Sequence, residues 1–430
     1  MRLWKMILCA ALAAVLPMSA LADMAVNGKS GAALIATDGT EILPMGEYAR
    51  IEPLKAGYWC GIDPEGKCVL LDKAGQPVTE ARFDELKCEK RTLLYREGAT
   101  WGILSDDGTP LVSAKYSDIR VNGDGDYIAL RNAVGTGTAQ NVDFLDENGA
   151  ETTIGVRVLY GLNDYSQGFM PVLFAKSGRY GYLDAQGVVA FEGQYIAVGE
   201  FRDGYAVVTT DDGTGMINRT GRMVVPDEYV DILRVGGIAL LKEKNGGVLV
   251  LRIGGEELLR VPAEAYVGEV GRYGLISTAE EMMLIDENGH VSAIFPASAT
   301  VVGGENGQII VSDGLWGEDH TYVALADGTP VSDRYQMILP LNEGGESGYY
   351  AVGRFDAEPV KDDAGEVIRY EWDAKGIRFA LMNGQGNLLT GFDYSAIRRA
   401  ETDRFYAETE DTYGVMDPSG EWLWTESGKQ

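Results

Sequence analysis

Residues 180–208 read YGYLDAQGVVAFEGQYIAVGEFRDGYAVV. Short runs of apolar, β-branched and aromatic residues alternate here with turn residues, and no run keeps the 3.6-residue period of a helix. One apolar run ends in Asp184-Ala185-Gln186-Gly187, where the aspartate can cap a turn and the glycine can supply a positive φ. The stretch therefore predicts short β-strands joined by tight turns.

The same pattern recurs along the chain. An apolar run followed by a polar turn that closes on glycine occurs eleven times, with the closing glycines at 39, 75, 108, 149, 187, 221, 255, 289, 328, 386 and 420. Four of the gaps are 34 residues, and the gap of 58 indicates an insertion, which we place at residues 341–376. An aromatic residue follows the glycine after seven to nine residues at Tyr48, Phe83, Tyr116, Tyr195, Tyr229, Tyr335 and Tyr394. The closing glycine and the aromatic residue are two landmarks that keep nearly constant spacing, and together they predict about eleven repeats over residues 23–430.

Each repeat has room for four short strands. In one copy these are residues 205–208, the apolar triplet, residues 223–225, and a fourth strand that we expect to start at the landmark aromatic Tyr229. A single meander cannot bury both of its faces, so neighbouring repeats must stack or pack radially. We predict an all-β array of short antiparallel meanders that is β-propeller-like, as one large ring or two successive rings; a β-solenoid is the alternative.

Residues 180–208 resemble the bacterial WG-repeat family. The shared pattern is an aromatic-glycine pair, an apolar pair, D-x-x-G, an apolar run and an aromatic residue before the next strand. The aromatic-glycine position is matched by Trp101-Gly102, Tyr180-Gly181 and Tyr413-Gly414, whereas residues 122–175 and 256–320 depart from the pattern. The resemblance implies a β-repeat scaffold of bacterial envelope or secreted proteins, with an interaction role and no shared catalytic residues.

Residues 1–22 predict a cleavable secretory signal peptide. Arg2 and Lys5 precede the short apolar run 6–16, and Ala20-Leu21-Ala22 forms a small-x-small cleavage site, so we expect the mature chain to start at Asp23. No later segment is apolar enough to cross a membrane. We therefore predict a secreted or cell-envelope protein, extracellular or periplasmic, without stable membrane insertion after cleavage.

The chain is strongly acidic. Its formal net charge of −28 becomes −30 once cleavage removes Arg2 and Lys5, and this charge disfavours nucleic acid and anionic membranes as partners. The mature cysteines are Cys60, Cys68 and Cys88, which permit one disulfide without identifying the pair. Because no C-x-x-C motif occurs, we predict no zinc site and no other metal or cofactor.

No constellation of catalytic residues stands out. The two histidines, His290 beside a turn glycine and His320 in a loop-like run, have no triad context. The D-x-x-G aspartates Asp72, Asp146, Asp184, Asp286 and Asp417 recur at one repeat position, which is typical of turn residues rather than of catalytic acids. Residues 122–126 (NGDGD) lack the glycine and the distal glutamate of an EF-hand. We therefore predict no catalytic, cofactor-binding or metal-binding residues.

Two functions remain open. The first is a secreted, non-catalytic interaction scaffold that binds protein or glycan through its loop faces, especially the irregular segments 122–141 and 341–376. Trp59, Trp316 and Trp372 lie outside the repeat pattern and are candidate ligand contacts, whereas the phased aromatics are expected in the core. The alternative is a carbohydrate-active hydrolase with carboxylates in a propeller funnel.

Overall fold

The computed structural model describes residues 24–28, 30–36, 38–54, 57–80, 83–122, 126–131, 139–160, 162–304, 306–315, 317–341, 348–401 and 403–426. The predicted signal peptide 1–22 and Trp316 lie outside these residues, as do parts of the segments 122–141 and 341–376. The chain divides into two compact units, residues 1–82 and 83–430. None of the described helices is long and apolar enough to span a membrane.

The first unit holds two three-stranded antiparallel sheets. One contains β1 (Met24–Gly28), β2 (Gly31–Ile35) and β3 (Glu41–Tyr48), and the other contains β4 (Arg50–Leu54), β5 (Tyr58–Ile62) and β6 (Cys68–Leu71). Leu34, Ile51 and Leu71 are fully buried in a core that both sheets share. Cys60 and Cys68 lie on the adjacent strands β5 and β6, and both are buried.

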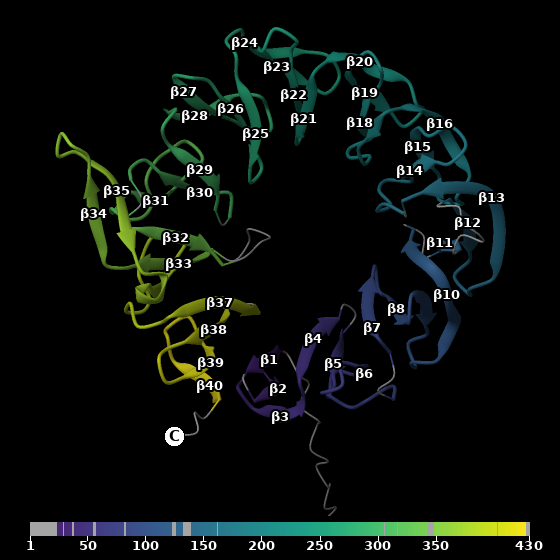
Figure 1. Ribbon diagram of the computed structural model, residues 1–430, viewed down its shortest axis with the longest axis horizontal. Coiled ribbons are helices and arrows are strands. Elements are labelled where there is room, and N and C mark those ends of the chain that lie inside the picture. The colour runs from purple at the N-terminus through teal and green to yellow at the C-terminus, as the bar shows by residue number, and fades with distance from the viewer. Residues whose placement is uncertain are drawn as a thin grey trace, which may run out of the picture. The chain divides into compact units, whose positions relative to one another are not determined.

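The second unit begins with a ten-stranded antiparallel sheet in which the strands follow chain order (Figure 1). Its strands are β7 (Glu85–Glu89), β8 (Thr92–Glu97), β9 (Thr100–Leu104), β10 (Pro110–Val121), β11 (Tyr127–Arg131), β12 (Gln140–Leu145), β13 (Glu151–Leu159), β14 (Met170–Phe174), β15 (Tyr180–Leu183) and β16 (Val189–Tyr195). The long strand β10 pairs with β9 up to Tyr116 and with β11 from Tyr116 onward. One strand thus closes one meander and opens the next, and β13 does the same between β12 and β14.

Separate four-stranded meanders follow. They are β17 (Ala197–Val198), β18 (Tyr205–Thr209), β19 (Thr214–Asn218) and β20 (Met223–Tyr229); β21 (Asp231–Val235), β22 (Ile238–Lys242), β23 (Val248–Arg252) and β24 (Glu257–Val261); and β25 (Tyr266–Val270), β26 (Tyr273–Ser277), β27 (Glu281–Ile285) and β28 (Val291–Pro296). Antiparallel four-stranded sheets of this kind are the unit of a propeller blade.

The remaining sheets complete the array. They are β29 (Thr300–Gly303), β30 (Ile309–Ser312) and β31 (Thr321–Ala324); β32 (Met337–Pro340), β33 (Tyr349–Arg354) and β36 (Arg378–Asn383); and β37 (Ala396–Glu401), β38 (Arg404–Glu408), β39 (Tyr413–Met416) and β40 (Trp422–Glu426). Between β33 and β36 lie a two-stranded hairpin of β34 (Ala357–Lys361) and β35 (Val367–Trp372) and a single 3-10 turn, η2 (Ala374–Gly376). This hairpin falls within residues 341–376.

The eleven closing glycines occupy one equivalent turn. Every one of them has a positive φ, between 70° and 109°, and donates its N–H to the carbonyl three residues earlier at 2.8–3.0 Å. L-residues rarely adopt this conformation, which explains why glycine recurs. An all-β repeat array of antiparallel meanders is therefore confirmed.

The landmark aromatic does not open the fourth strand, contrary to the sequence-based expectation. Tyr229 ends β20 opposite Thr214, and Tyr195 ends β16 opposite Tyr180. The chain then breaks for one residue before β17 and β21 start new sheets. Two apolar runs on either side of a sheet boundary look like one strand in the sequence, because periodicity does not mark which neighbour a strand pairs with.

The glycine of the aromatic-glycine pair has a steric reason. A Cβ at Gly102 would lie 2.5 Å from the carbonyl oxygen of Val112. Gly215 holds the same repeat position after Thr214, and a Cβ there would lie 2.6 Å from the carbonyl oxygen of Val225. At Gly414 the corresponding distance to the carbonyl oxygen of Trp424 is 2.2 Å. The backbone of the next strand passes so close to these glycines that no side chain fits. This contact explains why the second residue of the pair is glycine.

The turn aspartates predict how the fold responds to acid. Hydrogen bonds from Ser105 and then Thr109 lower the pKa of Asp107 to about 2, and the N–H groups of Thr40 and Thr329 lower the pKa values of Asp38 and Asp327. A carboxyl with a lower pKa in the folded state stabilises the fold above its unfolded pKa, near 3.8, and loses that effect as the pH falls through about 2.

We therefore expect the melting temperature of the mature chain to fall between pH 4 and pH 2. Thermal unfolding in a pH series measures this effect. Asp107→Asn should make the decline shallower, because the asparagine carries no charge to titrate. A melting temperature that stays level or rises over this interval would contradict the role given to the turn carboxylates.

Candidate functional site

The repeat aspartates are turn residues. At five of the closing turns of the repeat, which have the D-x-x-G sequence, the aspartate Oδ1 accepts the backbone N–H groups two and four residues further on, at 2.8–3.0 Å; these aspartates are Asp72, Asp146, Asp184, Asp286 and Asp417. This confirms the prediction from their recurrence. Their acceptor oxygens are engaged in the turn rather than directed at a ligand.

The two histidines differ in burial. The side chain of His290 is 79% exposed, and its Nδ1 lies 3.5 Å from the turn residue Asp286. His320 is buried in the connection between β30 and β31, with Nδ1 2.7 Å from the carbonyl oxygen of Glu318. His320 therefore lies in the interior of its connection rather than on the surface of a loop.

Most aromatic residues belong to the core. Of the phased aromatics, Tyr116 and Phe83 are fully buried, and Tyr48, Tyr195, Tyr335 and Tyr394 are nearly so. Tyr229 is half-buried and packs against a core cluster, so the packing role is confirmed with Tyr229 at the edge of the core. Trp59 is also buried, in the core of the first unit, so its selection as a ligand contact was wrong. Trp372 remains partly exposed on β35, with its ring centroid 5.4 Å from that of Phe355.

One cavity, with a volume of about 700 Å³, lies in the C-terminal part of the second unit. We call it the C-terminal groove. Its walls come from connections of three successive sheets: residues 306–308 between β29 and β30, residues 383–385 after β36, and Asp403 between β37 and β38. Residues 306–308 and Asp403 lie in hairpins between the first two strands of their sheets, whereas residues 383–385 lie in the turn that closes on Gly386. The array thus brings two kinds of turn, far apart in sequence, to one cavity.

Side-chain amides dominate the polar lining of the groove, from Asn306, Gln308, Asn383 and Gln385. Gln308 is fixed between the sheets, because its Nε2 donates to the carbonyl oxygen of Gly384 at 2.8 Å and its Oε1 accepts the hydroxyl of Tyr350 at 2.8 Å. An amide offers both donors and acceptors without a charge. This lining suits a ligand that is polar and neutral.

One carboxylate lies among the described lining residues of the groove. Asp403 sits in the hairpin turn between β37 and β38 with φ 55°. Burial, and next the charge of Asp403, raises the pKa of the neighbouring Tyr349 hydroxyl above its ordinary value. The hydroxyl therefore stays protonated at neutral pH and can donate a hydrogen bond.

A second cavity, of about 450 Å³, lies beside β14 and β17. We call it the Tyr160 pocket. Leu159 and Tyr160 at the end of β13, Asn163, and the segment 196–200 form parts of its lining. Tyr160 has φ 63°, in the left-handed region that bulky residues avoid, and is 87% exposed. Backbone strain at an exposed aromatic side chain suggests a functional constraint.

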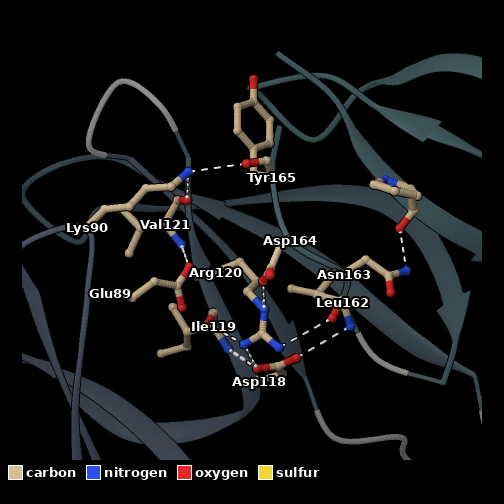
Figure 2. Close-up of polar contacts among 11 residues, drawn as sticks. Glu89, Lys90, Asp118, Ile119, Arg120, Val121, Leu162, Asn163, Asp164 and Tyr165 are labelled. Atoms are coloured by element: carbon tan, nitrogen blue, oxygen red, sulfur yellow. Dashed lines mark hydrogen bonds and ion pairs between the residues drawn. The ribbon is translucent and has the colours of Figure 1, made fainter. Parts of the chain in front are cut away.

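A polar network fixes the connection between β13 and β14, which contributes Tyr160 and Asn163 to this pocket (Figure 2). Asp118 on β10 accepts the N–H of Leu162 at 3.4 Å, and Arg120 donates to the carbonyl oxygen of Leu162 at 3.5 Å. Arg120 also pairs with Asp118 at 2.7 Å and faces Asp164 at 3.6 Å. The connection is therefore held by a charged pair whose side chains are both about four-fifths buried.

The other end of the connection is held as well (Figure 2). Asn163 donates to the carbonyl oxygen of Pro171 at 2.8 Å, and Lys90 Nζ donates to the carbonyl oxygens of Val121 and Tyr165 at 3.1 and 3.4 Å. Lys90 lies in the hairpin turn between β7 and β8 with φ 46°. The charged side chains of Figure 2 are thus engaged in bracing neighbouring meanders, which leaves the cavity rather than the network as the candidate binding site.

A family model for the WG containing repeat matches residues 180–213. No curated protein matches the chain significantly in sequence. Among solved structures, BamB from Moraxella catarrhalis is similar at 14% identity and a TM-score of 0.30, covering 65% of this chain and 94% of its own. Apo AztD from Citrobacter koseri is similar at 11% identity and a TM-score of 0.31, covering 72% of this chain and 93% of its own.

PorZ, a bacterial surface component of the type-IX secretion system of Porphyromonas gingivalis, is similar at 13% identity and a TM-score of 0.27, covering 81% of this chain and 52% of its own. TM-scores this low carry no argument about arrangement or activity. The family match supports the resemblance to WG repeats, because it falls on the stretch in which that resemblance was found. The chain therefore carries a WG containing repeat at residues 180–213, as the sequence predicted.

Proposed function

We propose that the protein is a non-catalytic interaction scaffold of the cell exterior or envelope, and that it binds a neutral glycan chain in the C-terminal groove. The observation that carries the proposal is that successive sheets contribute four side-chain amides to one cavity. Gln308 and the Oδ1 of Asn383 hold groups of the protein itself, so Asn306 and Gln385 are the amides that we expect a ligand to engage. Sugar hydroxyls both donate and accept hydrogen bonds, and amides match them in both roles. The apparent export signal at residues 1–22 supports a partner outside the cytoplasm.

The size and charge of the groove support the same ligand class. A volume of about 700 Å³ is within the range of ligand sites. No basic side chain occurs among its described lining residues, so the groove offers nothing to neutralise a phosphate or a sulfate. The net charge of −28 likewise disfavours nucleic acid as a partner.

The hydrolase alternative needs a second acid. Most glycosidases place two carboxyl groups about 5–10 Å apart on either side of the scissile bond. Asp403 is the single carboxylate among the described lining residues of the groove, and the repeat aspartates are engaged in their turns. These observations support binding rather than turnover.

Gln385→Ala tests the groove. We expect it to weaken binding of a neutral glycan about tenfold, because one hydrogen bond contributes about 1 kcal/mol and an unpaired buried polar group adds to the loss. Calorimetric titration of the mature chain with neutral β-glucan and chitin oligosaccharides measures the affinity.

Gln186→Ala is the matched control. Gln186 and Gln385 hold the same position in equivalent turns, and each donates its backbone N–H at 3.0 Å to the first turn residue, Asp184 or Asn383. Only Gln385 lines the groove. Equal losses in the two variants, or no neutral glycan bound by the parent chain, would refute the proposal.

A further inference from the structure

We propose that the Tyr160 pocket binds an alkylammonium group, such as a lysine side chain of a partner protein or a free amine. This site is independent of the proposed glycan groove. It rests on the lining of the pocket, the backbone strain at Tyr160, the bracing of its connection and the charge of the chain.

The lining combines the surfaces that an alkylammonium group requires. Leu159, Leu173 and Ile196 provide apolar wall against which methylene groups can pack. Tyr160 and Tyr180 provide aromatic rings, whose faces attract cations. The pocket volume of about 450 Å³ accommodates such a chain.

The charge of the lining selects a cation. Glu200 is the one ionisable carboxylate of the described lining, and no lysine, arginine or histidine lines the pocket. The nearest ion-pair partner described for Glu200 is Arg202, at 4.0 Å with its side chain 70% exposed, which is a weak surface pair. An anionic ligand would meet uncompensated repulsion here, whereas the net charge of −28 attracts cations.

Tyr160 is placed for binding rather than for packing. Its side chain is 87% exposed, so the ring contributes little to the core. Its φ of 63° disfavours a tyrosine and favours glycine or asparagine. The residues that follow are held by Asp118, Arg120 and Pro171, and this bracing maintains the conformation in the absence of a ligand. A preorganised, exposed ring can contact an ammonium group without a further cost of ordering the ring.

The test uses the mature chain, 23–430, and calorimetric or NMR titration with three probes: N-acetyl-lysine amide, n-butylammonium and N-acetyl-norleucine amide. We expect both ammonium probes to bind and the uncharged norleucine probe to bind at least fivefold more weakly. Tighter binding of the lysine probe than of butylammonium assigns the pocket to a protein lysine, and the reverse order assigns it to a free amine. Equal affinity for norleucine and lysine, or no affinity for either ammonium probe, overturns the proposal.

Variants separate binding from stability. Tyr160→Gly and Glu200→Gln should each weaken lysine binding at least fivefold, while Tyr160→Gly leaves the melting temperature unchanged or higher because glycine adopts this φ freely. Tyr160→Asn removes the ring and keeps a residue suited to the same conformation. Unchanged lysine binding in both Tyr160 variants overturns the proposal.

Matched controls lie elsewhere in the array. Tyr266 is 66% exposed on β25, and Glu269 follows a glycine there as Glu200 does. Tyr266→Ala and Glu269→Gln should leave lysine binding unchanged. Because none of these residues lines the C-terminal groove, loss of glycan binding and loss of lysine binding can be told apart.

Discussion

Arg131→Leu is expected to lower the free energy of unfolding by about 3 kcal/mol, because it leaves a buried carboxylate without its partner. Asp143 on β12 is fully buried, and its Oδ2 pairs with Arg131 at the end of β11. The other oxygen, Oδ1, has no hydrogen-bond partner among the described residues. The hydrogen bond with Asp143 is the main reason why the pKa of Arg131 is raised. Urea unfolding of the mature chain measures the change.

Two variants check that explanation. Lys115→Met breaks the pair of Lys115 with Glu151, at 2.6 Å, while Glu151 keeps its pair with Arg131. Because the Lys115 side chain is 48% exposed, we expect a loss of at most about 1 kcal/mol. Adding Asp143→Leu to Arg131→Leu should recover much of the lost stability, since no charge then remains buried. If Arg131→Leu left the free energy of unfolding unchanged, the buried Asp143 would not depend on this ion pair.

Gly221→Val is expected to lower the free energy of unfolding by about 3 kcal/mol, through two separate effects. Gly221 has φ 75°, which a β-branched residue adopts only with strain. A Cβ at this position would also lie 2.7 Å from the ring of Phe191 on β16, so the neighbouring sheet would have to move. Thermal and urea unfolding of the variant measure the combined effect.

Gly178→Val separates the two effects. Gly178 has a similar φ of 65°, but no atom lies within 4 Å of the Cβ that a side chain would add. Only the strain of the backbone should remain, about 1–2 kcal/mol. Equal losses of unfolding free energy in the two variants would mean that the contact with Phe191 adds nothing to the cost of a side chain at position 221.

The sequence was sufficient to predict the repeat and its turns. The D-x-x-G turn is a local structure: an aspartate oxygen, two N–H groups and a glycine with positive φ all lie within five residues. Local hydrogen bonds leave a local signature, and Gly221 and Asp184 were assigned correctly for that reason. The phase of the aromatics also revealed their burial, because a core position recurs once per repeat.

The sheet boundaries and the candidate sites were harder to predict, because non-local pairing decides them. Tyr229 closes one sheet and Asp231 opens the next, although the residues are almost adjacent. Trp59 lies outside the repeat pattern, yet it packs in the core of both sheets of its unit. Its chemical type alone could not show this burial.

The two cavities illustrate the same limit. Asn306, Asn383 and Asp403 meet in one groove only because two hairpins and a closing-glycine turn of successive sheets face one cavity. Tyr160 is followed by a connection in which Leu162 donates its N–H to Asp118 and accepts a hydrogen bond from Arg120, residues more than 40 positions earlier in the sequence. The recurrence of amides at equivalent turns, as in Gln186 and Gln385, is a sequence signal that points to such turns but not to the one that lines a groove.

We propose that this chain, which carries a WG containing repeat at residues 180–213, binds a neutral glycan in the C-terminal groove without converting it. The most direct test incubates the purified mature chain with neutral polysaccharides and measures bound glycan and released reducing ends in the same sample. We predict retention of glycan that Gln385→Ala reduces, and no release of reducing ends above that of a protein-free control. Release of reducing ends that Asp403→Asn abolishes would contradict the account and identify the groove as the active site of a hydrolase.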